Sequence, residues 1–250
     1  MPRLLPRHAL LLSLLFVGPS CLAQTKTPAP ENTPKATDSG LITCGDHPPY
    51  TSRTVKSDTL VTPDGKRKAY AEVEATALSP QRAAGYSGPL CVNNSRLFVT
   101  SDNGEFKLRF MQEPADVENG NSLRLIDWSA DGRRLLAELA EWHYEQPGVV
   151  HSILLFDSRY GTFQQPEVAH LLAKTYDHDC SLDFRILGFG LQGKIVLEGS
   201  PLSPEEEEIQ GVSSCVKKKT YFELDRATET LVSVPEMPKI QHNAKSEASK

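Results

Sequence analysis

The sequence predicts an all-β fold of three four-stranded antiparallel sheets, with one short helix near residues 166–176. The main observation is a repeated phrase, since Thr62-Pro63-Asp64-Gly65-Lys66-Arg67 returns as Ser129-Ala130-Asp131-Gly132-Arg133-Arg134. Each copy lies between two apolar stretches, and Asp-Gly in that setting is a strong signal for a β-hairpin. A third, eroded copy at Leu191-Gln192-Gly193-Lys194 makes the unit recur three times.

Runs of β-type residues between these turns allow each unit to be written as four strands, up and down. The expected strands are 59–61, 69–73, 97–99 and 106–110 in the first unit, then 123–128, 135–142, 153–156 and a weak strand after the turn 157–161 in the second, and 184–189, 195–197, 221–224 and 230–234 in the third. The unequal intervals between the units fit loops of variable length.

Two segments favour helix by local propensity. Residues 133–142 are rich in Leu, Ala and Glu, and Leu135, Leu139 and Trp142 are spaced as one helical face. The repeat places a strand there, and we predict a strand because tertiary context overrides so short a propensity signal. Residues 166–176 carry no such conflict, and with Pro in the first turn they predict a helix that bridges the second and third units.

A four-stranded sheet that repeats with an Asp-Gly hairpin between its first two strands resembles a β-propeller blade. The phrase Trp128-Ser129-Ala130-Asp131-Gly132-Arg133-Arg134-Leu135-Leu136 is similar to the TolB-type propeller repeat, and the resemblance covers residues 55–234. Propellers close with about four to eight blades, whereas this chain has three units. The resemblance therefore implies a partial, β-propeller-like fold: an incomplete ring, a ring with a fourth sheet from another subunit, or an open sandwich.

The first 23 residues have the pattern of a secretory signal peptide. Arg3 and Arg7 precede an apolar run over 9–17, and the pattern Cys21-Leu22-Ala23 predicts cleavage after Ala23. That run is far shorter than the roughly 20 residues of a membrane-spanning helix, so we expect no transmembrane segment in the mature chain. We expect a periplasmic or secreted protein, with a lipoprotein modified at Cys21 as the alternative.

Composition then divides the mature chain into three parts. Residues 24–43 are mostly polar or Pro and cannot offset the entropy of ordering, so we predict a disordered linker. Residues 44–238 are long enough for one β domain with its own core. Residues 239–250 are again polar and small, and we predict a disordered C-terminal tail.

The charge balance limits the classes of partner. The whole chain has a formal net charge of −5, and removal of the two arginines of the signal leaves 25 basic and 32 acidic residues, a net charge of −7. A modestly acidic protein repels polyanions and anionic lipid surfaces. We therefore expect no nucleic acid among its partners.

Four cysteines remain after cleavage, Cys44, Cys91, Cys180 and Cys215, and an even number in an oxidising compartment predicts two disulfides. Sequence alone permits three pairings. Cys91 and Cys215 each precede a strand of the same type, and Cys44 and Cys180 each precede the opening strand of a unit, so we predict Cys44–Cys91 and Cys180–Cys215. The alternatives are free buried thiols or a zinc site, although the chain has no C-x-x-C and no paired His spacing.

Other candidate residues are interpreted first as structural. Asp64 and Asp131 have the residue type of a cation ligand, but Asp-Gly is also what a tight hairpin requires. Residues 102–105 form the same kind of turn. Residues 177–180 combine Asp, His, Asp and Cys, but neighbouring side chains on an extended chain point to opposite faces. We therefore expect a solvated loop around His178.

No catalytic constellation is recognisable. The chain has no Gly-x-Ser-x-Gly elbow, no phosphate-cradling glycine loop and no zinc-protease motif. His143 and His151 flank a hairpin loop, and the acidic run 205–208 is expected to be a solvated loop, with a contact site for a basic partner as the alternative. We expect no enzyme activity, no cofactor and no metal.

These observations favour an exported, non-catalytic binding or scaffold module that engages a protein or an envelope component. One alternative is a small-ligand binding or sensing protein, which needs a pocket lined by aromatic residues such as Trp128, Trp142 and Tyr144. Another is a degenerate domain of the hydrolase-associated kind that acts only with a partner. A homo-oligomer is also possible, because three sheets leave edges that must be covered.

Overall fold

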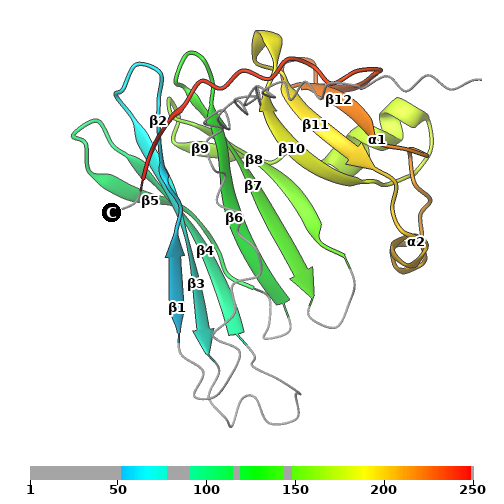
Figure 1. Cartoon of the computed structure of the whole chain (residues 1–250), viewed down its shortest axis with the longest axis horizontal. Helices are drawn as coiled ribbons and strands as arrows, with labels where there is room; N and C mark the ends of the chain where they lie inside the picture. Colours follow the sequence, from blue (N-terminus) through cyan, green and yellow to red (C-terminus); the bar gives the residue numbers. More distant parts are fainter. Residues whose placement is uncertain (1–51, 78–90, 115–118, 144–147, 249–250) are drawn as a thin grey trace, which may run out of the picture. The chain divides into compact units, whose positions relative to one another are not determined.

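Three antiparallel sheets follow one another along the chain (Figure 1). The computed structural model describes residues 52–77, 91–114, 119–143 and 148–248, all of which belong to one compact unit. The predicted signal peptide, the predicted linker and Cys44 lie outside the described residues.

Each sheet is built from strands that are mostly consecutive in the sequence. The first sheet contains β1 (Arg53–Lys56), β2 (Thr59–Val61), β3 (Lys68–Ala77), β4 (Cys91–Thr100), β5 (Phe106–Gln112) and β14 (Lys245–Glu247). The second contains β6 (Asn119–Trp128), β7 (Arg134–His143), β8 (Val150–Asp157) and β9 (Thr162–Gln164), and the third contains β10 (Asp183–Phe189), β11 (Ile195–Ser200), β12 (Thr220–Asp225) and β13 (Thr230–Val234). The predicted all-β fold is confirmed, and the first sheet has two strands, β1 and β14, that the repeat did not predict.

The repeated phrase forms the same hairpin in the first two sheets. The hydroxyl of Thr62 donates to Asp64 Oδ1 at 2.6 Å, and the hydroxyl of Ser129 donates to Asp131 Oδ1 at 2.6 Å. In both turns the same carboxylate oxygen accepts the backbone N–H two residues later at 3.1 Å, and the glycine after the Asp has a φ of 74° or 66°. The Asp fixes the turn and Gly accepts its left-handed conformation, so the structural interpretation of both pairs is confirmed.

The third copy of the hairpin lacks this carboxylate. Gly190 stands where the other copies have Thr or Ser, and its N–H donates to Lys194 O at 2.8 Å to close the turn. The turn contains a short 3₁₀ helix, η1 (Leu191–Gly193), in which Gln192 and Gly193 have φ values of 61° and 71°. The sequence identified this copy correctly as eroded.

The second sheet lies between the other two, with both of its faces buried. One face shares a core with the first sheet, and the members of this core include Trp128, Leu97, Leu123, Leu135, Leu154 and Phe156. The other face shares a core with the third sheet, and its members include Leu136, Ile153, Leu155, Ile186, Leu197 and Phe222. Face-packed sheets of this kind form a core about 10 Å thick at each interface.

β7 shows why local propensity failed over residues 133–142. Its side chains alternate between the two cores, since Leu135 and Leu139 face the first sheet while Leu136 faces the third. A strand buried on both faces has no solvent-facing side, so its sequence loses the regular alternation that marks a half-exposed strand. The repeat predicted it correctly.

The described chain has two α-helices, and the first packs against the third sheet whereas the second buries none of its residues. α1 (Val168–Tyr176) buries Val168, Leu171 and Leu172 in the core between the second and third sheets, as expected for the helix predicted near 166–176. The sequence predicted a solvated loop over 205–208, and this was wrong. α2 (Pro204–Gln210) begins there with a capping box in which Ser203 and Glu206 bond to each other's backbone N–H.

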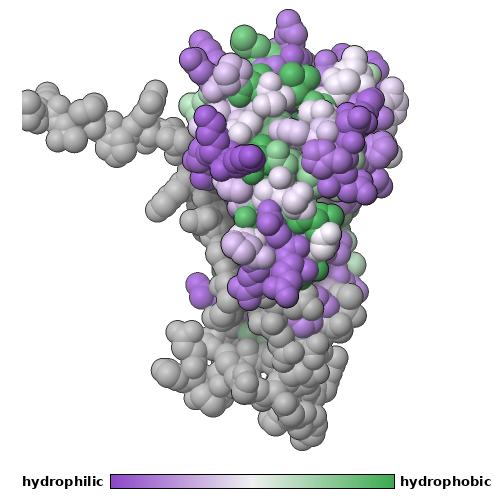
Figure 2. All heavy atoms as spheres, turned by 90° about the vertical axis from the view of Figure 1, so that its right-hand side faces the viewer, coloured by the Kyte–Doolittle hydropathy of each residue, from purple (hydrophilic) through white to green (hydrophobic). Residues whose placement is uncertain are grey.

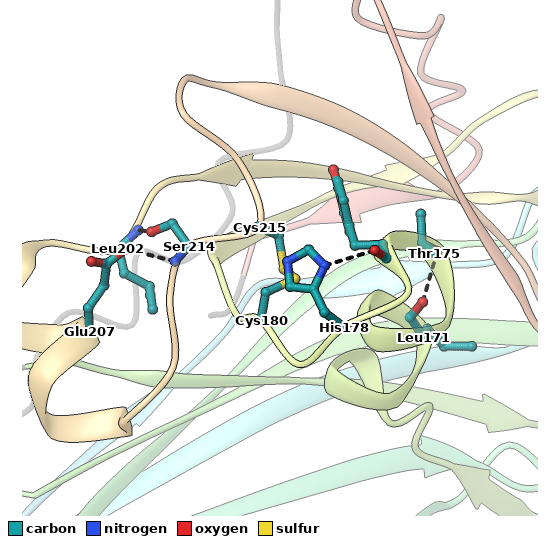
Figure 3. Close-up of a disulfide and its surroundings, with 9 residues drawn as sticks. Leu171, Thr175, His178, Cys180, Leu202, Glu207, Ser214 and Cys215 are labelled. Carbon is teal, nitrogen blue, oxygen red and sulfur yellow. Dashed lines mark hydrogen bonds between the residues drawn. A yellow bond between two sulfur atoms is a disulfide. The ribbon is translucent and has the colours of Figure 1, made fainter.

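A disulfide joins Cys180 to Cys215 (Figure 3). It ties the chain before β10 to the chain before β12, and Cys215 N donates to Ser181 O at 2.8 Å beside it. Ser214, next to the bridge, bonds to Leu202 N and to Glu207 Oε1, which anchors the segment around α2. This predicted disulfide is confirmed. Cys91 is also disulfide-bonded, but its predicted partner Cys44 lies outside the described residues, so that pairing stays a prediction.

Residues 240–247, which we call the C-terminal strap, contact the first hairpin strand of every sheet (red in Figure 1). Gln241 N donates to Phe189 O at 2.8 Å in β10. In β6, the buried carboxylate of Asp127 accepts Asn243 N at 3.0 Å and Ala244 N at 2.7 Å. β14 then pairs with β2, so the predicted disordered tail over 239–250 was wrong for this segment.

The strap meets equivalent positions of the three repeats. Ile240, Asn243 and Ser246 contact the penultimate residues of β10, β6 and β2, which are Gly188, Asp127 and Leu60. An extended chain rises about 3.3 Å per residue, so three residues span about 10 Å, which is the spacing of face-packed sheets. The strap therefore advances one sheet for every three residues.

We expect Asp127→Ala to release the strap and lower the free energy of unfolding by about 2 to 3 kcal/mol, because buried N–H groups lose their acceptor. Denaturant unfolding measures the loss, and faster hydrogen exchange at residues 241–247 shows whether the strap is its source. Asp102→Ala, which removes a carboxylate from the exposed turn between β4 and β5, is the matched control and should leave strap exchange unchanged.

We expect the double substitution Cys180→Ser, Cys215→Ser to lower the free energy of unfolding by about 2 to 4 kcal/mol, because the bridge closes a loop with a sequence separation of 35 residues. Chemical denaturation without a reducing agent measures the difference. An unchanged midpoint would contradict a stabilising role for the bridge.

Candidate functional site

The acidic residues singled out in the sequence have structural partners. Hydrogen bonds from Thr62 and from the N–H of Lys66 hold the pKa of Asp64 below its ordinary value. For Asp131, partial burial opposes ionisation, but bonds from Ser129 and the N–H of Arg133 outweigh it, and its pKa also falls. Each carboxylate therefore accepts hydrogen bonds within its own turn.

The cluster around His178 does not converge on one point. His178 is exposed after the end of α1, and its Nδ1 lies 2.8 Å from Tyr176 O (Figure 3). Asp177 is the left-handed cap of the helix, and Cys180 is in the disulfide. The described residues contain no group of three or more His, Cys, Asp or Glu that could hold a metal ion.

Trp128 and Trp142, two of the aromatic residues expected around a ligand, do not share a pocket. Trp128 is fully buried between the first and second sheets, and its Nε1 donates to Leu60 O at 3.3 Å. Trp142 lines a cavity of 430 Å³, and Tyr144 lies outside the described residues. Trp128 is therefore a core residue that joins two sheets.

A larger cavity of 660 Å³ lies beside β8, between the start of α1, the start of β10 and the end of α2. It shares Val149, Val150 and Gln210 with the 430 Å³ cavity. We call the two together the β8 groove. His151 and His170, which the sequence placed far apart, both line its larger part.

The groove follows the open edge of β8. β9 pairs with β8 through only three residues, Thr162 to Gln164, opposite Leu155 to Asp157. No strand of the described chain pairs with β8 on that side before Leu155. β9 cannot extend further because Pro166 has no N–H for the ladder, and the chain turns there into α1.

A buried polar network lies next to this edge, on the face of the second sheet that meets the third. Arg124 on β6 lies opposite Glu138 on β7, and its Nε donates to Glu138 Oε2 at 2.7 Å. His151 Nδ1 on β8 lies 3.2 Å from Glu138 Oε1, and Arg124 Nη2 donates to Ile186 O at 3.3 Å in β10. The sequence did not predict this network, because its three residues come together only through strand register.

Burial by itself would raise the pKa of Glu138, but contacts with His151 and Arg124 outweigh it and hold the pKa below its ordinary value. The carboxylate is therefore ionised in the folded protein at neutral pH. Its partner Arg124 lies in the same sheet and reaches the third sheet through the hydrogen bond to Ile186 O. Glu138 orients His151 at the wall of the groove.

A second surface is the outer side of the first sheet. Tyr70 stacks on Phe98 with ring centroids 4.8 Å apart and meets Phe106 edge to face at 4.9 Å, while Lys56 Nζ lies 3.7 Å from the centre of the Tyr70 ring. Phe106, Leu108 and Met111 are exposed by 41%, 47% and 47%. We call Tyr70, Phe98, Phe106, Leu108 and Met111 the outer aromatic face.

The outer side of the third sheet is different in character. Ion pairs cover it, with Lys194 Nζ 2.8 Å from Glu223 Oε2 and Lys219 Nζ 2.9 Å from Glu198 Oε1. On the side of the molecule where α1 and α2 lie, hydrophilic residues interrupt the hydrophobic ones (Figure 2). The outer side of the first sheet carries ion pairs too, with Arg96 Nη2 2.7 Å from Glu74 Oε2, so the two ends of the stack differ in the aromatic cluster around Tyr70.

No protein-family model matches the sequence, and no curated protein matches it. The fold and its surfaces define a disulfide-bonded all-β protein of three stacked sheets. The resemblance of the repeat to the TolB-type propeller repeat stays a prediction.

We expect Glu138→Gln to be destabilising, and the loss to depend on pH. Since the folded pKa of Glu138 lies below its ordinary value, its ionised form stabilises the fold above the unfolded pKa of about 4.3, and this contribution disappears as pH falls through the folded pKa. The difference in unfolding free energy between wild type and variant should therefore shrink between about pH 5 and pH 3. Glu141→Gln on the same strand is the control, and a pH-independent difference for Glu138→Gln would contradict the prediction.

Proposed function

We propose that the chain is an exported, non-catalytic binding or scaffold module that engages a protein or an envelope component through the outer aromatic face. The observation that carries this proposal is the exposure of Phe106, Leu108 and Met111 on one side of one sheet. Contiguous exposed apolar surface of this kind marks interaction sites, and aromatic residues dominate the energetics of protein interfaces.

The arrangement of the sheets supports the same proposal. Both faces of the second sheet and the inner faces of the first and third are covered within the described chain. The outer aromatic face is the apolar sheet surface that is left, and its place in the stack is where a further sheet would pack. This is what an incomplete TolB-like propeller would present to a partner.

The outer side of the third sheet does not complement this surface. Its ion pairs, Lys194 with Glu223 and Lys219 with Glu198, would lose hydration against the exposed aromatic and apolar side chains of the first sheet. Head-to-tail closure of copies into a ring is therefore disfavoured, and we propose a partner with an apolar contact surface of its own.

The disulfide between Cys180 and Cys215 indicates an oxidising, non-cytoplasmic compartment. Neither α1 nor α2 nor any other helix in the described part of the chain is long and apolar enough to cross a membrane. We propose export by the N-terminal signal, with cleavage after Ala23, to the periplasm or the exterior.

We expect a photoreactive benzoyl-phenylalanine at position 106 of the full-length protein, produced in its source organism, to form one discrete cross-linked adduct upon irradiation. The matched control places the same residue at Val232, which is 53% exposed on the outer side of the third sheet and should give no such adduct. Mass spectrometry of the adduct identifies the partner, and an adduct of two copies would identify it as a second copy of this chain. No adduct at position 106, or the same adducts from both positions, would overturn the proposal.

A further inference from the structure

We propose that the β8 groove binds an extended, basic peptide segment of a partner protein, which adds to the second sheet as a strand beside β8. This site is separate from the outer aromatic face and does not depend on it. A module with both sites would hold two partners, or two parts of one partner, at once.

The edge of β8 presents to the groove backbone groups that no strand among the described residues pairs with. Ser158 N donates to Arg133 O towards β7, whereas Asp157 O accepts Gly161 N on the opposite side. The register with β7 is unbroken from Asp157 back to Val150, and backbone direction alternates along a strand, so the N–H and C=O of His151 point away from β7. Peptides that add to a sheet edge bind through such groups.

In the other two sheets a strand occupies the position that the groove has beside β8. In the first sheet β5 pairs with β4 from Ser95 to Thr100, and in the third β13 pairs with β12 from Tyr221 to Asp225. In the second sheet β9 covers three of the eight residues of β8, and the groove occupies the place of the missing part. The natural occupant of a strand position is an extended chain.

The accessible edge is short and has apolar walls. Ile153 and Leu154 are buried, so the peptide would lie along residues 149–152, which span about 13 Å at 3.3 Å per residue. Val149 and Val150 are 46% and 65% exposed, and Phe184 and Leu172 form the opposite wall. Alternate side chains of an added strand would find apolar contacts on this wall.

The charge of the groove selects a basic segment. Its lining includes four carboxylates and no Lys or Arg among the described residues, and the four are Glu113, Glu141, Glu167 and Asp183. Of these, Glu141 accepts a hydrogen bond from Gln112, while Glu167 and Asp183 are exposed at the two sides of the larger cavity. Glu206 of α2 lies close to Gly148 and adds a further negative charge at the rim.

The test measures binding of a fluorescein-labelled eight-residue peptide of alternating Val and Lys to the full-length oxidised protein by fluorescence anisotropy. We expect saturable binding that weakens at least tenfold when Glu replaces Lys in the peptide. We also expect at least a tenfold loss when alternate backbone nitrogens are methylated, because such a peptide keeps its charge but cannot form a ladder. Equal binding of the methylated peptide would overturn strand addition.

Protein variants locate the site. Glu167→Lys with Asp183→Lys should weaken binding at least tenfold, whereas Asp102→Lys with Glu236→Lys changes the net charge equally at exposed positions outside the groove and should change it less than twofold. Circular dichroism confirms that both variants are folded. Equal effects of the two pairs would overturn the assignment to the groove.

A third variant separates this site from the proposed function. Phe106→Ser with Leu108→Ser alters the outer aromatic face, and we expect unchanged affinity for the peptide. Loss of peptide binding in this variant would place the peptide on the outer aromatic face and overturn the inference. The cross-linking experiment at position 106 tests the proposed function separately, because it does not use the peptide.

Discussion

A stack of three sheets has two outer faces that no neighbouring sheet covers, and this constraint shapes the rest of the molecule. The second sheet has both faces in a core, which is why β7 carries Leu135 and Leu136 on opposite sides. The outer sides of the two end sheets differ. The third sheet carries ion pairs such as Lys194 with Glu223, while the first sheet exposes aromatic residues such as Phe106. The outer aromatic face is therefore exposed because no fourth sheet of the described chain packs on the first sheet.

The C-terminal strap holds the stack together by using one repeated position three times. The penultimate residues of β2, β6 and β10 receive the strap, and each does so by a different chemistry. Leu60 pairs through its backbone, Asp127 accepts N–H groups with a buried carboxylate, and Gly188 makes room, since a Cβ there would lie 2.9 Å from Ile240. Burial raises the pKa of Asp127, and the N–H groups of the strap oppose that rise, so ionisation of this residue and docking of the strap are coupled.

The β8 groove shows why sequence reasoning missed the candidate site. The walls of its larger cavity come from residues 149–152, 165–170 and 181–184 and from Leu172 and Gln210, which no local pattern connects. They meet because β9 ends early, at Gln164 before Pro166, and because α1 then packs beside β8. The edge of β8 can form hydrogen bonds because β9 pairs only with Leu155 to Asp157, and the sequence of β8 itself does not show this. The acidic run that was expected to be a loop is α2, and Ser203 with Glu206 was a local capping signal that could have identified it.

The sequence by itself determined the strands of the three units, the hairpins at Asp64 and Asp131, the helix α1 and the Cys180–Cys215 pairing, because turn chemistry and repetition act between neighbouring residues and recur along the chain. Tertiary structure alone decided that residues 240–247 form an ordered strap, that Arg124, Glu138 and His151 meet, and that no described strand pairs with β8 before Leu155. These features depend on contacts between residues far apart in sequence. Their energies come from burial and from acceptors that exist only after the sheets have stacked, so no pattern within a single segment records them.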